Sequence, residues 1–556
     1  MSKYHISKEK IDNIKQHAQG KKGMVTSAHP IASQVGADIL EKGGNAVDAA
    51  AAVQFALNVV EPMNTGIGGS GFMMIHHAKT DQTCMVNGHA RSPKKVDKDI
   101  FLDENGEVES FRERSLDATA VEVPGVLKAM ETALEKFGTM SLAEVIDPAI
   151  ALAEEGVPVS STLAAHIAIF QGQITDLAKK TFLPEGKTPN IGEKIDLSDL
   201  GKAFRLIQEQ GSDALYNGEI GKALVETVQQ DGGLLTMDDL RNYEAQIQEP
   251  VWGEYRGHKI ASAAPPSSGG TMVVQLLELL EELNVTDYDI HSWEKFYLVA
   301  EAMRLVYADR ETFMGDPEFA DIPVEGLLHP DYIKERAKEV KWEFSNPTIH
   351  YGNPWKYQDG EPQLNERGGK EESPETTHFS VIDSEGNVVS CTTSLERPFG
   401  SGYIVPGYGF MLNNELTDFD PEPGGNNEVQ PRKRSMSTKS PSILFKDGKP
   451  VLGLGSPGGP TIISSVAQVI LNVIGYGMDL KDAIEEPRIY TSKYPILIFE
   501  KGIPEEVFEK LKEKGHRFDK HAAQLGNVQA VHIDQETGTY YGAADSSRSG
   551  GAVGID

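Results

Sequence analysis

The sequence predicts a mixed α/β (α+β) fold, and three observations support this prediction. Apolar residues recur at helical spacing over residues 29–59, and a mainly helical pattern runs from about 125 to 345. A polar stretch at 346–374, rich in Pro, Gly, Glu and Lys, is typical of an exposed loop. After Glu375, short β-rich runs dominate. A helix-rich first two-thirds therefore precedes a strand-rich last third.

The first helical pattern divides into two helices. Apolar side chains at Ile31, Val35 and Ile39 share one face, the Gly-Gly-Asn at 43–45 interrupts the pattern, and it resumes over Val47–Leu57. A run of four alanines in the second segment predicts close packing against a neighbouring element.

A glycine-rich segment at 65–71 follows, and Phe72–His76 is expected to form a strand. Gly66, Gly68 and Gly71 match the GxGxxG pattern of dinucleotide-binding loops. Such a loop needs a strand before the motif and a helix after it, whereas the order here is reversed. We therefore expect no NAD or FAD at this segment.

The later elements complete the mixed pattern. A short β-like insert at Gly253–Ala261 ends in a turn at 265–270. Strands are expected at Thr377–Ile382, Val388–Ser394, Gly409–Leu412, Ser442–Lys446, Val451–Leu454, Val528–Ile533 and Tyr540–Ala543, and a helix at Ile462–Ile474.

Composition and short motifs argue against several classes of function. The formal net charge is −30 over 556 residues, which repels nucleic acid and anionic membranes. Two cysteines form no zinc cluster, and no HExxH, CxxC or EF-hand motif occurs, so we expect neither a metal nor a cofactor. The charged N-terminus lacks an apolar signal core and no run of about 18 apolar residues occurs, which predicts a cytoplasmic protein.

One predicted hairpin brings three polar side chains together. Its two β-rich runs flank a five-residue turn at 383–387 that contains Gly. Centring the register on this turn places Thr376 opposite Ser394, with Cβ atoms roughly 4.5–5.5 Å apart. Glu396 follows two residues later and is expected on the same face of the strand.

A threonine hydroxyl is a weak nucleophile that needs a nearby base. The α-amino group of an N-terminal residue, with a pKa near 7.7–8.0, can serve as that base. Cleavage between Glu375 and Thr376 would create it, at the junction of a loop and a strand where a break disturbs the fold little. From the hairpin alone, however, Thr376 is more simply explained as an ordinary β-branched strand residue.

Further motifs favour Thr376 as a nucleophile over an ordinary strand residue. Thr-Thr-His-Phe-Ser-Val at 376–381 is followed in order by Leu-Asn-Asn-Glu-Leu-Thr-Asp-Phe-Asp at 412–420, Ser-Met-Ser-Thr-Lys-Ser-Pro at 435–441 and Gly-Ser-Pro-Gly-Gly at 455–459. With this set, nearly the whole chain resembles γ-glutamyltranspeptidase (glutathione hydrolase) precursors of the N-terminal nucleophile hydrolase superfamily. The resemblance is to the Bacillus type, with cephalosporin acylases as related members.

The resemblance implies a four-layer αββα sandwich and self-cleavage before Thr376. A large subunit, 1–375, and a small subunit, 376–556, would then remain together as one αββα unit. The implied catalytic residues are the nucleophile Thr376, its hydrogen-bond partner Ser394 and the oxyanion-hole glycines Gly458 and Gly459.

The resemblance also implies how a γ-glutamyl group is bound. The implied binders are Glu396, Glu415 and Asp418 for the α-ammonium, and Ser437 and Thr438 for the α-carboxylate. Relatives place a carboxylate-clamping Arg four residues before Pro93, where this chain has His89, with Arg91 two residues on. Either Arg91 takes over through a shifted turn or carboxylate binding is weak. The short connection from Asp420 to Arg432 implies an open cleft without a lid.

The sequence therefore predicts an enzyme that transfers a γ-glutamyl group from a small molecule such as glutathione to water or an amine. The partners expected are this substrate and the two subunits of one precursor, with a higher oligomer left open; many relatives are secreted. A glutaryl-type cephalosporin acylase is the first alternative, because His89 weakens the carboxylate argument. A glutaryl group lacks the ammonium that the three acids would bind. The further alternative is an uncleaved, inactive binding homologue.

Overall fold

The computed structural model describes residues 4–360 and 375–556, so residues 361–374 of the predicted polar loop lie outside the described residues. The first part of that loop contains one short 3-10 turn, Pro354–Lys356. Within the described ranges, no helix combines the length and the apolar character needed to cross a membrane.

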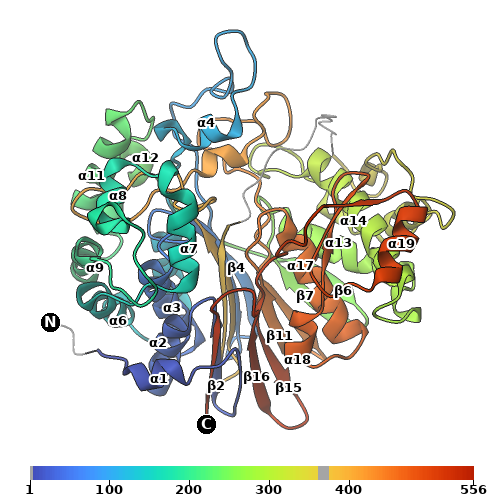
Figure 1. The fold of residues 1–556 in the computed structure, drawn as a ribbon, viewed down its shortest axis with the longest axis horizontal. Helices are drawn as coiled ribbons and strands as arrows, with labels where there is room; N and C mark the ends of the chain where they lie inside the picture. The colour runs from blue at the N-terminus through green and yellow to red at the C-terminus, as the bar shows by residue number, and fades with distance from the viewer. Residues whose placement is uncertain (1–3, 361–374) are drawn as a thin grey trace.

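Two antiparallel seven-stranded sheets form the centre of the molecule (Figure 1). Sheet one has the order β17 (Gly551–Ile555), β2 (Gly23–Ser27), β8 (Thr377–Asp383), β9 (Val388–Ser394), β3 (Ser70–His77), β4 (Gln82–Gly88) and β5 (Gln246–Gln248). Sheet two has the order β1 (His17–Gly20), β16 (Thr539–Ala544), β15 (Gln529–Asp534), β11 (Lys449–Gly455), β10 (Ser442–Lys446), β7 (His258–Ser262) and β6 (Val251–Tyr255). A small sheet joins β12 (Ile489–Tyr490), β13 (Ile496–Phe499) and β14 (Arg517–Phe518).

Helices cover the outer face of each sheet. The layer on sheet one comprises α2 (Pro30–Glu41), α3 (Ala46–Val60), α5 (Val126–Phe137), α6 (Leu142–Glu155), α7 (Ser161–Phe170), α8 (Asp176–Phe182), α9 (Ser198–Gln210), α10 (Asp213–Tyr216), α11 (Glu219–Gln230) and α12 (Met237–Arg241). The layer on sheet two comprises α13 (Gly269–Glu282), α14 (Trp293–Phe313), α15 (Val324–Leu327), α16 (Pro330–Ala337), α17 (Thr461–Ile470), α18 (Leu480–Glu485) and α19 (Glu505–Glu513). Two short helices, α1 (Lys8–Asp12) and α4 (Phe111–Ser115), lie near the N-terminus and at the top of Figure 1.

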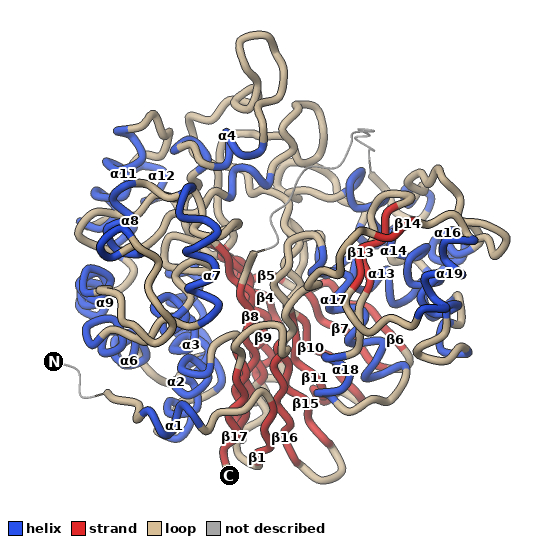
Figure 2. Tube along the Cα trace, in the orientation of Figure 1, coloured by secondary structure: helices blue, strands red, loops and turns tan. Residues whose placement is uncertain are grey.

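Strand β3 explains why the two sheets stack. Its residues are apolar on both faces: Phe72 and Met74 pack between the two sheets, whereas Met73 and Ile75 pack against the first helix layer. Each such buried side chain contributes about 1.5–3 kcal/mol relative to an exposed one. The resulting order of helix, sheet, sheet and helix is the αββα sandwich (Figure 2).

The small-residue helix α3 is buried along all 15 of its residues. Asn45 caps it, and its side chain and that of Asp48 satisfy each other's backbone N–H groups as a capping box. Asp48 also accepts a hydrogen bond from the Thr139 hydroxyl at 2.6 Å, which ties the helix start to the loop after α5. The predicted break at 43–45 and the close packing of the alanine run are both confirmed.

The hairpin register is also confirmed. Thr377 pairs with Thr393 and Ile382 with Val388, so the register places Thr376 opposite Ser394. The predicted strand Gly409–Leu412 is wrong, because its backbone partners lie in the loop at 401–405 and Gly409 adopts the left-handed φ of 65°.

Both sheets take strands from either side of the Glu375–Thr376 bond. β8 lies between β2 and β9 in sheet one, and β10 lies between β7 and β11 in sheet two. The first two-thirds of the chain is therefore more than the helical part that its sequence indicates, since it supplies β1 to β7. If this bond were cleaved, both fragments would still contribute strands to the same two sheets.

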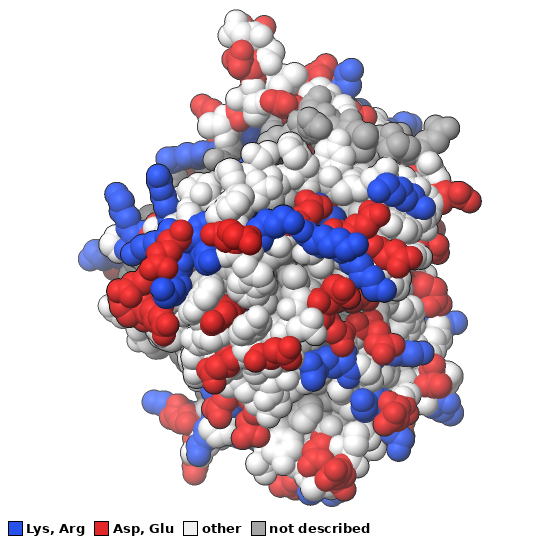
Figure 3. Space-filling view, turned by 90° about the vertical axis from the view of Figure 1, so that its right-hand side faces the viewer, with Lys and Arg blue, Asp and Glu red and all other residues white. Residues whose placement is uncertain are grey.

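Acidic and basic side chains are interspersed on the face seen in Figure 3. On this face the Lys and Arg side chains lie next to Asp and Glu. The net charge of −30 therefore does not exclude local positive charge at the surface.

Candidate active site

A row of three hydroxyl side chains crosses the end of sheet one, and we call Thr376, Ser394 and Ser70 the hydroxyl row. Ser394 closes β9, with Ser70 directly opposite it on β3 and Thr376 on its other side. Neighbouring strands lie about 4.7–4.9 Å apart, so the row spans roughly 9–10 Å. The shared face looks toward sheet two, as the packing of Ile382 on the same strand face indicates.

The two hydroxyls at the Thr376 end meet the peptide bond before Thr376. Thr376 Oγ1 lies 2.5 Å from the Glu375 carbonyl oxygen and 3.4 Å from Ser394 Oγ. Ser394 Oγ donates to the same carbonyl at 3.1 Å. The nucleophile candidate and a hydroxyl donor therefore converge on one carbonyl, the arrangement that stabilises negative charge developing on its oxygen.

An ion-pair network fixes Glu375 from the other side. Arg548 Nη2 donates to its carboxylate at 2.7 Å, and His166 Nε2 lies 3.3 Å away. Burial raises the pKa of Glu375, but Arg548 and His166 outweigh this effect and hold it below its usual range. Arg548 Nη1 also donates to the Thr376 carbonyl at 3.3 Å, so one guanidinium holds the residues on both sides of this bond.

The glycine-rich segment rejected as a nucleotide loop positions Ser70. A Cβ on Gly69 would lie 2.2 Å from the Ser394 carbonyl oxygen, so only glycine allows the two backbones to approach. Ser70 Oγ then donates to Glu415 Oε1 at 2.6 Å. Gly69 thus allows close contact between the two backbones. The segment connects helix α3 to strand β3, the order that the sequence indicates.

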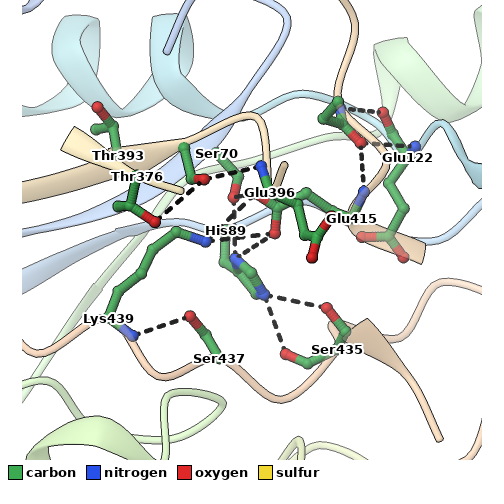
Figure 4. Close-up of polar contacts among 12 residues, drawn as sticks. Ser70, His89, Glu122, Thr376, Thr393, Glu396, Glu415, Ser435, Ser437 and Lys439 are labelled. Atoms are coloured by element: carbon green, nitrogen blue, oxygen red, sulfur yellow. Dashed lines mark hydrogen bonds and ion pairs between the residues drawn. The ribbon is translucent and has the colours of Figure 1, made fainter. Parts of the chain in front are cut away.

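A group of charged side chains adjoins the hydroxyl row, and we call it the charged cluster: His89, Glu122, Glu396, Glu415, Asp418 and Lys439. Asp418 is partly exposed, and the other five are buried and labelled in Figure 4. Its residues come from five separate segments of the chain. Four of the six are the substrate binders expected from the sequence, and Glu122 and Lys439 join them only in the structure.

Glu396 follows the end of β9 with a φ of 81°, so it leaves the strand instead of continuing its face. Its N–H donates to Ser394 Oγ at 2.8 Å, and Asn414 Nδ2 donates to its carboxylate at 2.5 Å. Burial, and then the charges of Asp418 and Glu415, raise its pKa to about 8. A cation placed beside Glu396 would favour its ionised form.

Glu415 opens the 3-10 turn Glu415–Asp418 and is fully buried. Lys439 Nζ lies 3.3 and 3.4 Å from its two carboxylate oxygens. His89, Glu415 and Asp418 hold possible metal-ligand atoms within 4.8 Å of one another. The Lys439 ammonium already pairs with Glu415, so a metal ion or any other cation at this carboxylate would have to displace it.

His89 lies inside the cluster, whereas Arg91 does not join it. His89 is fully buried, with Nδ1 3.0 Å from Ser70 Oγ and Nε2 3.0 Å from the Ser435 carbonyl oxygen. Arg91 directs its guanidinium to Glu318 at 3.2 Å and to the Arg432 carbonyl. The shifted-turn alternative for Arg91 therefore finds no support in its contacts.

Glu122 is a second carboxylate that faces Glu415. Its backbone is held by the Asn413 side chain, yet neither of its carboxylate oxygens has a hydrogen-bond partner among the described residues. Burial, and then the charges of Glu415 and Asp418, raise its pKa well above the usual range. Nothing in the local sequence Ala-Val-Glu-Val-Pro marks this residue, because an isolated Glu after a helical turn usually faces solvent.

Ser437 and Thr438 lie in an irregular segment before β10 that is fastened to the start of α13. The Ser437 N–H donates to the Pro266 carbonyl at 3.1 Å, and its carbonyl accepts from Ser268 N–H at 2.8 Å. Its hydroxyl accepts from the Lys439 N–H at 3.2 Å. The backbone of this segment is therefore fixed directly before Lys439, whose side chain reaches the charged cluster (Figure 4).

Gly458 and Gly459 lie in the loop between β11 and α17, with φ values of 139° and 52°. Neither N–H donates a hydrogen bond to any described residue. The loop leaves sheet two where a Cβ on Gly455 would touch the ring of His378, two residues from Thr376 on the same strand face. Two backbone N–H groups without an acceptor among the described residues, located just before the N-terminus of α17, can bind an anion.

Known proteins resemble this chain over nearly its whole length. The family profile described as Gamma-glutamyltranspeptidase matches residues 32–555. The glutathione hydrolase proenzyme of Bacillus subtilis (strain 168) is 52% identical over 549 residues, which cover 98% of this chain and 93% of that protein. The acylase ACY 1 proenzyme of Pseudomonas sp. (strain SE83) is 37% identical and covers 97% of this chain and 95% of its own length.

A solved structure agrees with the fold. The cephalosporin acylase from Bacillus halodurans superimposes with a TM-score of 0.85 at 28% identity, covering 98% of this chain and 97% of that chain. The fold is therefore shared over nearly the full length of both chains.

Proposed function

The chain belongs to the γ-glutamyltranspeptidase family, and we propose that it is a self-processing γ-glutamyl hydrolase and transferase with Thr376 as its nucleophile. One observation carries this proposal. The Thr376 hydroxyl contacts both Ser394 and the Glu375 carbonyl, beside a group of buried carboxylates.

Self-cleavage follows from the contacts at the Glu375 carbonyl. Thr376 Oγ1 adds to this carbon, the peptide C–N bond breaks, and the proton passes to the leaving nitrogen, which gives an ester and a free α-amine on Thr376. The Ser394 hydroxyl, 3.1 Å from the carbonyl oxygen, stabilises the charge in this step. Water then hydrolyses the ester and leaves the fragments 1–375 and 376–556.

Turnover uses the groups that cleavage sets free. The α-amine of Thr376, with an ordinary pKa near 7.7–8.0, takes the proton of Oγ1 as the hydroxyl adds to the γ-carbonyl of a donor. The N–H groups of Gly458 and Gly459 receive the oxyanion, an effect of about 3–4 kcal/mol where single donors have been removed in other enzymes. The amine of the donor leaves, and water or an acceptor amine releases the γ-glutamyl group.

The charged cluster selects the donor. Glu396, Glu415 and Asp418 supply acceptors for the three N–H donors of an α-ammonium. Ionisation of Glu396, whose pKa is about 8, is favoured when that cation arrives. Glutathione is the donor with this chemistry that we propose for a first assay.

A glutaryl acylase is the second candidate. It is favoured by the similarity to two acylases and by His89 in place of an Arg. A glutaryl group has no ammonium, so it would bring no positive charge to Glu396, Glu415 and Asp418. The γ-glutamyl reading is therefore preferred.

One experiment tests both candidates. Purified protein is characterised by intact mass and assayed with γ-glutamyl and glutaryl p-nitroanilides, and with glutathione in the presence and absence of a dipeptide acceptor. We expect two fragments divided at Glu375–Thr376 and a preference for the γ-glutamyl anilide of at least about tenfold, the loss expected for one hydrogen bond to a charged group. An active protein with this peptide bond intact would refute the mechanism, and faster glutaryl release would favour the acylase.

A further inference from the structure

A γ-glutamyl donor carries an ammonium and a carboxylate on one carbon, and the charged cluster already contains an ion pair of matching charges. Lys439 Nζ lies 3.3 Å and 3.4 Å from the oxygens of Glu415. Both side chains are buried, at 5% and 0% exposure. The cost of removing these charges from water is therefore already part of folding.

We propose that Lys439 binds the α-carboxylate of the donor, while the donor's ammonium takes the place of Lys439 beside Glu415. The internal ion pair would then be exchanged for two ion pairs with the substrate. This inference rests on the proposed function and adds to it the cation that determines donor specificity.

The geometry of the Lys439–Glu415 ion pair allows the substrate ammonium to replace Lys439. Charge-assisted N–H···O bonds usually measure about 2.7–2.9 Å, so both Lys439 contacts are long. Glu415 is held independently, because Ser70 Oγ donates to it at 2.6 Å. The carboxylate can therefore stay in place while the flexible four-carbon stem of Lys439 moves.

The base of the lysine is fixed near the hydroxyls expected to bind the same carboxylate. The Lys439 N–H donates to Ser437 Oγ at 3.2 Å, and Ser268 Oγ donates to the Ser437 carbonyl at 2.7 Å. In Figure 4 the lysine side chain extends from this segment toward Glu415. An ammonium and the hydroxyls of Ser437 and Thr438 thus come from consecutive residues.

The two cations considered from the sequence are less suitable. Each ring nitrogen of His89 already contacts a polar group of the protein, Ser70 on one side and Ser435 on the other. The Arg91 guanidinium contacts Glu318 and the Arg432 carbonyl instead of the cluster. Lys439 Nζ lies 3.3 Å from Glu415, closer than the 3.5 Å between His89 Nδ1 and the same carboxylate, and its flexible stem lets the ammonium move, so it is the stronger candidate.

If the substrate replaces the internal ion pair in this way, tight binding requires both the carboxylate and the ammonium of the donor. A 4-aminobutanoyl group is a γ-glutamyl group without its carboxylate, and it would leave Lys439 without a partner. A glutaryl group lacks the ammonium and would leave Glu415 without one. Because an unpaired buried charge is strongly unfavourable, each truncated donor should bind more weakly than the complete one.

Three p-nitroanilides test the assignment on mature enzyme: γ-glutamyl, 4-aminobutanoyl and glutaryl. Their kcat and KM are measured for the wild type, Lys439→Met, Lys439→Gln and Lys439→Arg. Lys446→Met, in β10 away from the cluster, is the matched control. Two neutral variants, Lys439→Met and Lys439→Gln, are included so that the assignment can still be tested if one of them does not fold.

We expect Lys439→Met and Lys439→Gln to raise KM for the γ-glutamyl anilide about 10- to 100-fold, with a smaller change in kcat. KM for the 4-aminobutanoyl anilide should stay the same or fall, because this donor no longer leaves an ammonium unpaired. Lys439→Arg should recover most of the γ-glutamyl affinity, and Lys446→Met should change none of the three.

Equal losses on the γ-glutamyl and 4-aminobutanoyl anilides would overturn the assignment, because Lys439 would then serve only to hold Glu415. The wild type separates this outcome from a failure of the proposed function. If wild-type enzyme does not release the γ-glutamyl group at all, the proposed function fails; if it does and the variants lose both donors equally, only the assignment of Lys439 fails.

Discussion

The hydroxyl row stands on three adjacent strands, whereas the charged cluster is assembled from five segments that leave or precede regular elements. In the row, strand pairing fixes each position, and the groups are neutral and hydrogen-bonded. In the cluster, loops bring carboxylates together, and the pKa of Glu396 and that of Glu122 are raised. The difference suggests that the sheet supplies reactive geometry while the loops supply substrate choice at some expense in stability.

The largest effect should come from the row. Thr376→Ala removes the nucleophile of both reactions, so we expect no cleavage by intact mass and a loss of anilide hydrolysis of at least about 10³-fold. Thr80→Ala, in the exposed turn between β3 and β4, is the control and should process normally. Activity near the wild-type level in Thr376→Ala would show that Thr376 of the hydroxyl row is not the nucleophile.

The next effect concerns the guanidinium behind the row. Arg548→Gln removes the contacts with Glu375 and with the Thr376 carbonyl, so we expect self-cleavage to slow by about 10- to 100-fold. A time course on denaturing gels gives the rate. Arg205→Gln breaks a surface pair with Glu154 and should leave the rate unchanged. Equal rates for the two variants would show that Arg548 does not position the bond.

A smaller effect should appear in the pH dependence of donor choice. Because the pKa of Glu396 is raised to about 8, this residue is mostly neutral below that pH and ionised above it. The ratio of γ-glutamyl to glutaryl kcat/KM should therefore rise between about pH 7 and 8.5. Titration of the Thr376 amine affects both donors and cancels in the ratio.

In Glu396→Gln the ratio should stay flat with pH and lie about tenfold below the wild-type value at the upper end. A ratio that rises equally in the variant would mean that another group of the cluster titrates.

The smallest effect should be on stability. The folded-state pKa of Glu122 lies above its unfolded value, so wild-type stability falls as pH rises from the unfolded pKa toward the folded one. Glu122→Gln removes this loss. The Tm of the variant should equal that of the wild type near pH 4 and exceed it by roughly 2 °C or more near pH 8. The exposed Glu104→Gln should show no such trend, and a variant less stable at pH 8 would mean that Glu122 is ionised and paired.

The expectations that succeeded depend on neighbours in the chain. The register of the 377–394 hairpin follows from its turn and alternating strands, and the start of α3 follows from the capping pair Asn45 and Asp48. The strand expected at Gly409–Leu412 failed because its backbone found partners in its own loop, which apolar content cannot reveal.

By itself, the sequence determined the family, the hairpin and the pairing of Thr376 with Ser394, because an ordered set of short motifs indicates the first, and one strand–turn–strand pattern decides the other two. Only the tertiary structure decided that Ser70 meets Glu415, 345 residues away, that Arg548 holds Glu375, and that Lys439 and Glu122 enter the charged cluster. The physical reason is that such contacts depend on where two sheets and their loops bring distant segments together, and buried charges acquire their protonation only from those neighbours.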